Sequence, residues 1–293
     1  MPDGRGDAVH VWSLGKSAGE INGMPIPGWR PTKTLALFHY LLDRRDHPVG
    51  RATLTETFWP DEDARAPETS LKVAIHGLRR MLGGALGPGP GAGSSHGCGA
   101  GARLAIETHR SGYLLRAEGV WYDAAEFERN ITEASRLQAK GASAQAVTVL
   151  GQAVRLYRGN FLAGAGGDWV LRRRQALADR YLHALMRLAE AHLSARRYHT
   201  SISLCLKALN EDPCCERSYQ ILMLCQARIG MAGGMHAWHD LCAQTLSDRL
   251  GTRPSRETER LFHQLRGVSQ VSRSLPSPAN NSALTAVTEG SAS

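Results

Sequence analysis

The sequence has 293 residues and lacks any long apolar segment. No run approaches the roughly 20 residues that a helix needs to cross a bilayer. Residues 1–7 are polar and partly acidic, unlike the basic start and apolar core of a secretory signal peptide. We therefore expect a cytoplasmic protein that does not use a membrane as a partner.

Cysteine is scarce, with six residues and no Cys-x-x-Cys pair. Cys214, Cys215 and Cys225 are a conceivable zinc site, but structural zinc uses regular paired spacings that are missing here. Buried reduced thiols explain these residues better, because free cysteine behaves as a small apolar side chain. We expect no disulfide framework, no metal and no other cofactor.

Catalytic motifs are absent as well. The chain has 12 histidines, yet none stands with a serine, cysteine or carboxylate in a recognisable catalytic order, and no His-Glu-x-x-His occurs. Neither a Gly-x-x-x-x-Gly-Lys-Ser/Thr phosphate loop nor a phosphorylatable receiver segment is visible. An enzyme is the first alternative class to consider, and the sequence argues against it.

The amino-acid composition divides the chain into three parts. Residues 83–102 are rich in glycine and predict a loop without regular structure. The pattern becomes almost wholly helical after about residue 118, and residues 267–293 have the polar composition of a disordered tail. We predict one domain over residues 1–118, a second over 119–266, and a tail over 267–293.

The first part has a mixed α and β pattern. A β-branched run at residues 9–14 and the Asn22-Gly23 turn in residues 20–29 predict a small sheet. A helix should begin at Thr32 or Thr34, run to residue 43 and stop before Pro48-Val49, and a short helix should cover residues 53–58.

A third helix is predicted over residues 69–82, where apolar residues recur at helical spacing and define one buried face. Residues 103–108 and 113–116 then predict two strands of a hairpin, joined by residues 109–112. Helix, short helix, basic helix and hairpin follow one another in the order of a winged helix-turn-helix.

Local charge is more informative than the formal net charge of +8, most of which comes from arginine. Residues 43–68 carry four arginines against seven acidic residues, a net of −3, whereas residues 69–116 carry six basic residues against Glu107, a net of +5. A basic helix and hairpin in a nearly neutral domain are typical of DNA binding, because cations must face phosphates.

Candidate DNA contacts follow from the face opposite the apolar stripe. Arginine can bind guanine O6 and N7 with two hydrogen bonds, and an apolar side chain can contact a thymine methyl group, whereas lysine and threonine more often bind the backbone. The competing interpretation is a helix face that carries charge only for solubility. The candidates are Thr69, Lys72, Val73, His76, Arg79 and Arg80 on the helix and Arg110 at the hairpin tip.

Other aromatic and basic residues receive structural interpretations. Trp59, Tyr113 and Trp169 have apolar, regularly spaced neighbours, so we expect core packing for all three. Residues 172–174 and 196–197 are arginine runs that we interpret as solvated helix faces.

The second part predicts about seven helices between Asp123 and Arg266, one of them long, over residues 169–195. Leu188-Ala189-x-Ala191 and Leu222-Met223-x-Cys225 repeat at an offset of 34 residues, which suggests tetratricopeptide-like helical hairpins. Asp212-Pro213 and Arg253-Pro254 should mark helix boundaries.

These motifs together resemble the actinobacterial antibiotic-regulatory proteins of the SARP type, over about residues 8–266. Residues 70–82, Ser-Leu-Lys-Val-Ala-Ile-His-Gly-Leu-Arg-Arg-Met-Leu, and Gly112-Tyr113-Leu114-Leu115 resemble its OmpR/PhoB-type winged helix. Residues 157–162, Tyr-Arg-Gly-Asn-Phe-Leu, and residues 250–255, Leu-Gly-Thr-Arg-Pro-Ser, resemble its bacterial transcriptional activation domain. The loop at 83–102 is longer than in that family, and Leu114 replaces a basic residue.

The resemblance implies an α+β N-terminal winged helix-turn-helix followed by an all-α tetratricopeptide-like helical-repeat domain. It implies a sequence-specific, nucleoid-associated transcriptional activator that binds double-stranded promoter DNA as a homodimer at tandem repeats and contacts the RNA polymerase holoenzyme. Helix 69–82 would enter the major groove, and wing 103–116 would lie on the backbone or in the minor groove. The alternatives are a helical-repeat interaction scaffold and a ligand-sensing regulator that does not itself activate.

Overall fold

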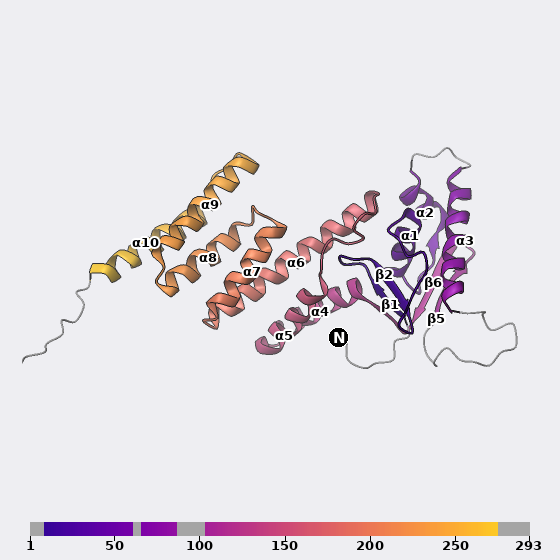
Figure 1. The fold of residues 1–293 in the computed structure, drawn as a ribbon, viewed down its shortest axis with the longest axis horizontal. Coiled ribbons are helices and arrows are strands. Elements are labelled where there is room, and N and C mark those ends of the chain that lie inside the picture. Colours follow the sequence, from indigo (N-terminus) through magenta and orange to yellow (C-terminus); the bar gives the residue numbers. More distant parts are fainter. Residues whose placement is uncertain (1–8, 61–65, 87–102, 275–293) are drawn as a thin grey trace, which may run out of the picture. The chain divides into compact units, whose positions relative to one another are not determined.

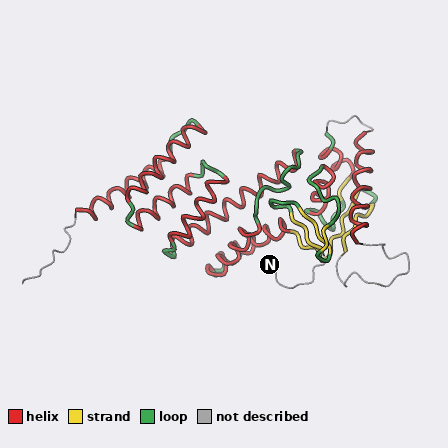
Figure 2. The backbone as a smooth tube through the Cα atoms, viewed as in Figure 1, coloured by secondary structure: helices red, strands yellow, loops and turns green. Residues whose placement is uncertain are grey.

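The computed structural model describes residues 9–60, 66–86 and 103–274. The chain divides into two compact units, and the boundary between them follows Leu188, inside a long helix. The strands of the described residues all belong to the first unit, and the second unit is helical (Figure 2). None of the described helices is long and apolar enough to cross a membrane.

The first unit begins with a four-stranded sheet of order β3-β2-β1-β7. Strands β1 (Val9–Trp12), β2 (Ala18–Ile21) and β3 (Met24–Pro25) are antiparallel neighbours. Asn22 and Gly23 have positive φ values of 51° and 79°, which confirms the predicted tight turn. Strand β7 (Val120–Tyr122) joins β1 in parallel. The sequence does not predict this strand, because three residues are too few for a periodic signal.

Three helices follow the first three strands and form the helical part of a winged helix (Figure 1). Helix α1 (Lys33–Leu42) is capped by Thr32, whose hydroxyl accepts a hydrogen bond from the amide of Leu35 at 3.3 Å. Helix α2 (Arg51–Phe58) begins two residues earlier than the predicted 53. Helix α3 (Ala66–Leu86) extends past the predicted 69–82 at both ends, so residues 83–86 are helical and not part of a loop.

The wing is a hairpin of β5 (Arg103–Thr108) and β6 (Gly112–Glu118), as predicted. A short strand β4 (Val49–Gly50) adds to β6, where Gly50 faces Gly112. A Cβ atom on Gly112 would overlap the carbonyl group of Val49, so only glycine allows this close approach of the two strands. The expected break at Pro48-Val49 therefore includes a strand.

Seven helices follow within the described residues 123–274, which agrees with the predicted number. Helices α4 (Asp123–Ala139) and α5 (Ser143–Leu156) pack as a hairpin in the first unit. The long α6 (Asp168–Ser194) begins in the first unit and ends in the second. The second unit continues with four helices, which are α7 (Tyr198–Glu211), α8 (Glu216–Ile229), α9 (Ala232–Leu250) and α10 (Arg256–Ser274).

Helix boundaries fall at both predicted prolines. Asp212 caps the C-terminus of α7, and Arg253-Pro254 lies between α9 and α10. Helix α10 continues to Ser274, so residues 267–274 are helical although the sequence predicts a disordered tail from residue 267. The rest of that predicted tail, and residues 87–102 of the predicted loop, lie outside the described residues.

Candidate nucleic-acid interface

Helix α3 has a buried face and an exposed face at the spacing that its sequence predicts. Its buried stripe holds the unit together and contains Leu71, Ala74, Ile75, Leu78 and Leu82. The side chains of all six candidate residues on this helix are exposed: Thr69, Lys72, Val73, His76, Arg79 and Arg80. The fold therefore presents them together on one side of one helix.

Three of these residues make the exposed face chemically distinctive. Lys72 and Arg80 form no hydrogen bond or ion pair with any other described residue. Val73 is 67% exposed and places an apolar side chain on an otherwise polar face. Two cations without partners among the described residues, beside an exposed apolar group, are suited to an anionic ligand that also carries methyl groups.

Arg79 differs from its neighbours because it is bonded to the wing. Its Nε donates to the carbonyl oxygen of Ile106 at 3.0 Å, and its Nη2 donates to Oγ1 of Thr108 at 2.8 Å. Helix α3 and strand β5 are joined by these contacts. The structure thus separates Arg79 from the other helix candidates, although the sequence groups it with them.

The wing turn is compact and exposes Arg110. The amide of His109 donates to the carbonyl of Gly112 at 2.9 Å, and the amide of Gly112 donates back at 3.2 Å. Only two residues, Arg110 and Ser111, therefore lie outside the paired backbone. Arg110 is exposed at this tip, as predicted.

The three candidate aromatics are core residues, which confirms their structural interpretation. Trp59, Tyr113 and Trp169 are all buried. Trp169 meets the ring of Tyr40 edge-to-face, with 5.2 Å between ring centroids. These rings anchor α6 and the wing to the body of the first unit.

The prediction of a solvated face for residues 172–174 is wrong for two of the three arginines. Arg173 forms ion pairs with Asp43 at 2.9 Å and with Glu128 at 2.7 Å, and its side chain is only 16% exposed. Arg174 donates to the carbonyls of Phe161, Leu162 and Ala165. Only Arg172 has the exposed position that the sequence predicts. The partners are too distant along the chain for any spacing rule to reveal.

A second buried joint connects the first sheet to α4. The carboxylate of Asp123 accepts hydrogen bonds from the amides of Ser13 and Leu14 and from the hydroxyl of Ser13, at 2.8–2.9 Å. Asp123 and Ser13 are both buried. With the ion pairs of Arg173, this joint fixes the winged helix to the first helices that follow it within one unit.

No metal site appears among the described residues. Five cysteines are free, and no group of three potential metal ligands occurs in the described ranges. Burial raises the pKa of the Cys225 thiol and raises that of Cys242 to about 12, which keeps both protonated. Cys98 lies outside the described residues.

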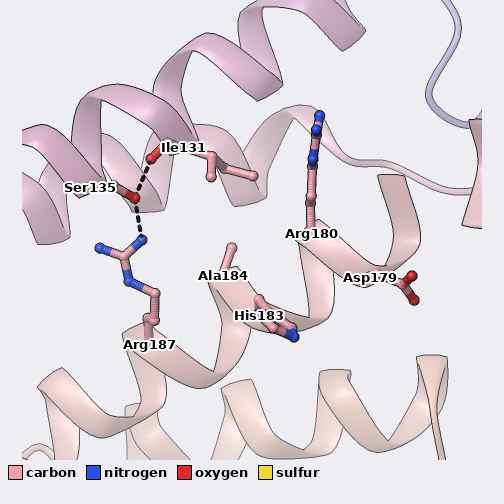
Figure 3. Close-up of a pocket in the computed structure, with 7 residues that line it drawn as sticks. All are labelled: Ile131, Ser135, Asp179, Arg180, His183, Ala184 and Arg187. Carbon is pink, nitrogen blue, oxygen red and sulfur yellow. Dashed lines mark hydrogen bonds between the residues drawn. The ribbon is translucent and has the colours of Figure 1, made fainter. Parts of the chain in front are cut away.

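One shallow pocket of about 280 Å³ lies between α4 and α6 (Figure 3). Arg187 turns toward Ser135, to which it donates a hydrogen bond at 3.0 Å, and Arg180 pairs with Glu128. Arg180 and Arg187 extend in different directions and do not converge on one point (Figure 3). The pocket therefore offers weaker chemistry for a ligand than the exposed face of α3.

Comparison with known proteins agrees with this architecture. Residues 122–266 match the family model of the bacterial transcriptional activator domain. A curated relative, the regulatory protein AfsR of Streptomyces griseus, is 22% identical over 264 residues, which cover 87% of this chain and 25% of AfsR. The chain thus spans about a quarter of the length of that relative.

A solved structure shows the same fold. Mycobacterium tuberculosis EmbR, determined in complex with a low-affinity phosphopeptide, superposes with a TM-score of 0.71 at 22% sequence identity. The match covers 90% of this chain and 68% of EmbR. It confirms the predicted fold class, a winged helix followed by a tetratricopeptide-like helical domain.

The fold and the order of its elements define a winged-helix module followed by a helical-repeat domain. Residues 122–266 match the bacterial transcriptional activator domain, and the similarity of the chain to AfsR and EmbR supports the predicted resemblance to regulators of the SARP type.

Proposed function

We propose that this protein is a sequence-specific DNA-binding transcriptional activator. Residues 69–82 of α3 enter the major groove, and the wing of residues 103–116 lies on the phosphate backbone or in the minor groove. One observation carries the proposal: the exposed face of α3 holds Lys72 and Arg80, which make no bonds to other described residues, beside the exposed Val73. Because the proposed partner is promoter DNA, we also propose that the protein acts in the cytoplasm, on the nucleoid.

The residues have different roles on DNA. Arg80 reads guanine through two hydrogen bonds, Val73 contacts a thymine methyl group, and His76 lies between them on the same face. Thr69, Lys72 and Arg110 bind phosphates and set the register of the protein on the duplex. No cofactor or catalytic step is needed for this activity.

The test uses a duplex that the protein itself selects from a random-sequence library. Fluorescence anisotropy should show that Arg80→Ala weakens binding by about 10- to 100-fold and relaxes the preference for one guanine. Arg155→Ala is the matched control, because Arg155 is also an exposed helical arginine but belongs to α5. Equal affinity and base preference for wild type and Arg80→Ala would contradict the assignment.

The helical domain supplies the other half of the proposed activity. We assign it homodimerisation on DNA and contact with the RNA polymerase holoenzyme, and the match of residues 122–266 to an activator domain supports this assignment. Analytical ultracentrifugation with and without a duplex carrying two sites tests the dimer. In vitro transcription with a truncated chain that ends before α7 tests the activation step separately from DNA binding.

A further inference from the structure

An arginine of another helix forms hydrogen bonds with the turn of the wing, residues 109–112. Arg51 is the first residue of α2, and its Nη1 donates to the carbonyl of Arg110 at 3.2 Å while its Nη2 donates to that of His109 at 3.5 Å. These two carbonyls belong to the turn that exposes the Arg110 side chain. A guanidinium group that spans both restricts the direction in which the turn points.

Helix α3 holds the same hairpin at a second place. Arg79 donates to Ile106 and Thr108 on β5, and these bonds use the Nε and Nη2 groups of its guanidinium. The buried ring of Tyr113 lies between the two attachments, with its centroid 5.7 Å from the Arg51 guanidinium carbon and 6.0 Å from that of Arg79. Two cations therefore share one aromatic ring, and both also bond to the hairpin.

This arrangement leaves Arg79 poorly placed to read a base. The Nε–Nη2 edge of its guanidinium is already occupied, and turning it toward DNA would break both bonds to the hairpin. Arg80, the next residue, has no such bonds to other described residues. Adjacent arginines on one helix are thus fitted to two different tasks.

We propose that Arg51 and Arg79 are positioning residues that fix the wing turn relative to α3, so that Arg110 meets the DNA backbone while α3 occupies the groove. The role of Arg110 rests on the proposed function, whereas the rigidity of the turn does not. Arg79 affects DNA affinity through Arg110 and contacts no base.

A double-mutant cycle tests the coupling on DNA. Loss of Arg110 should lower the salt slope of binding by about 0.9, the value for one phosphate contact. Arg79→Ala should weaken binding by a similar factor and lower the slope equally, yet change affinity less than 1.5-fold when Arg110 is already alanine. Arg80→Ala combined with Arg110→Ala is the matched control, and its effects should multiply. Independent effects of Arg79 and Arg110, or a change of base preference in Arg79→Ala, would overturn the proposal.

A second measurement does not require DNA. Amide hydrogen exchange at residues 110–112 of the free protein should accelerate in Arg51→Ala and Arg79→Ala but not in Arg80→Ala. Arg79→Gln, which retains one donor, should show an intermediate rate and provides a folded alternative should the alanine variant unfold. Unchanged exchange in both Arg51 and Arg79 variants would overturn the positioning role even if DNA binding holds. If the Arg51 and Arg79 variants show the expected faster exchange but the wild-type protein does not bind DNA, the result would contradict the proposed function alone.

Discussion

Helices α3 and α6 both carry adjacent arginines, and Arg80 of α3 has the opposite environment to Arg173 and Arg174 of α6. On α3, Arg80 is exposed and unpaired among the described residues, beside an exposed valine. On α6, Arg173 is bonded to Asp43 and Glu128, and Arg174 is bonded to three carbonyl groups. Arg173 and Arg174 of α6 thus satisfy acceptors of the protein itself, whereas Arg80 of α3 has none among the described residues.

The comparison shows that the partner of an arginine, more than its position in a basic run, decides its role. Arg79 makes the same point within α3, because its bonds to the wing give it a structural task, whereas the neighbouring Arg80 is exposed and has no bond to the part of the chain that the structure describes. Three predictions test this contrast between side chains that are bonded within the protein and side chains that are exposed to an external ligand. They run from the largest expected effect to the smallest.

The largest effect should come from Arg173→Ala. Burial raises the pKa of Asp43, and the charge of Arg173 opposes that shift, so removal of the guanidinium leaves a poorly hydrated carboxylate without its counter-ion. Glu128 loses two hydrogen bonds at the same time. We expect the free energy of unfolding to fall by about 3 kcal/mol, measured by urea denaturation.

The control for this variant is its neighbour. Arg172→Ala removes an exposed arginine from the same helix and should change stability by less than about 0.5 kcal/mol. Equal effects of the two substitutions would show that the ion pairs of Arg173 add no more to the free energy of unfolding than an exposed arginine does.

The same comparison extends to a buried histidine. His39 of α1 is fully buried among the rings of Trp29, Phe38, Tyr122 and Phe161, and burial lowers its pKa to about 3. The unfolded chain binds a proton at His39 below pH about 6.5, while the folded chain does not, so stability is lost as the pH falls from there toward 3. Between pH 7 and pH 5 this one group should cost about 2 kcal/mol.

His39→Leu should flatten this part of the pH profile of unfolding, because it removes the group that titrates only in the unfolded chain. A wild-type slope that survives in His39→Leu would assign the acid sensitivity to other groups.

The smallest effect concerns Val73, for which we propose a thymine methyl group as the partner. Since its side chain is 67% exposed, Val73→Ala should change stability by less than about 0.5 kcal/mol. On DNA it should cost about 1 kcal/mol through the lost methyl contact. Replacing single thymines of the duplex by deoxyuracil should weaken wild-type binding at one position and leave Val73→Ala unaffected there. Equal sensitivity of both proteins would exclude the methyl contact.

Much of the fold could be predicted because it depends on local patterns. The apolar stripe of α3, the cap at Thr32, the Asn22-Gly23 turn and the prolines at 213 and 254 each act within one helical turn or hairpin. The exposed face of α3 is also predictable, since burying Leu71, Ile75 and Leu78 leaves the opposite residues outside.

The rest depends on contacts between distant parts of the chain. Strand β7 is defined by pairing with β1, more than 100 residues earlier, and not by its own three residues. The partners of Arg173 come from the C-cap of α1 and from α4, and those of Arg79 come from β5. Residue type alone predicts solvated arginines at both places, because a single sequence carries no sign of which carboxylate or carbonyl the fold will bring near.

The salt dependence of binding tests the central claim most directly. If the α3 face binds phosphates, the logarithm of the association constant for the selected duplex should fall linearly with the logarithm of salt concentration, by about 0.9 for each phosphate contact. Lys72→Ala should reduce the steepness of that line by about 0.9, and Arg155→Ala should leave it unchanged. Binding that is insensitive to salt, or an identical slope for Lys72→Ala and wild type, would contradict the account.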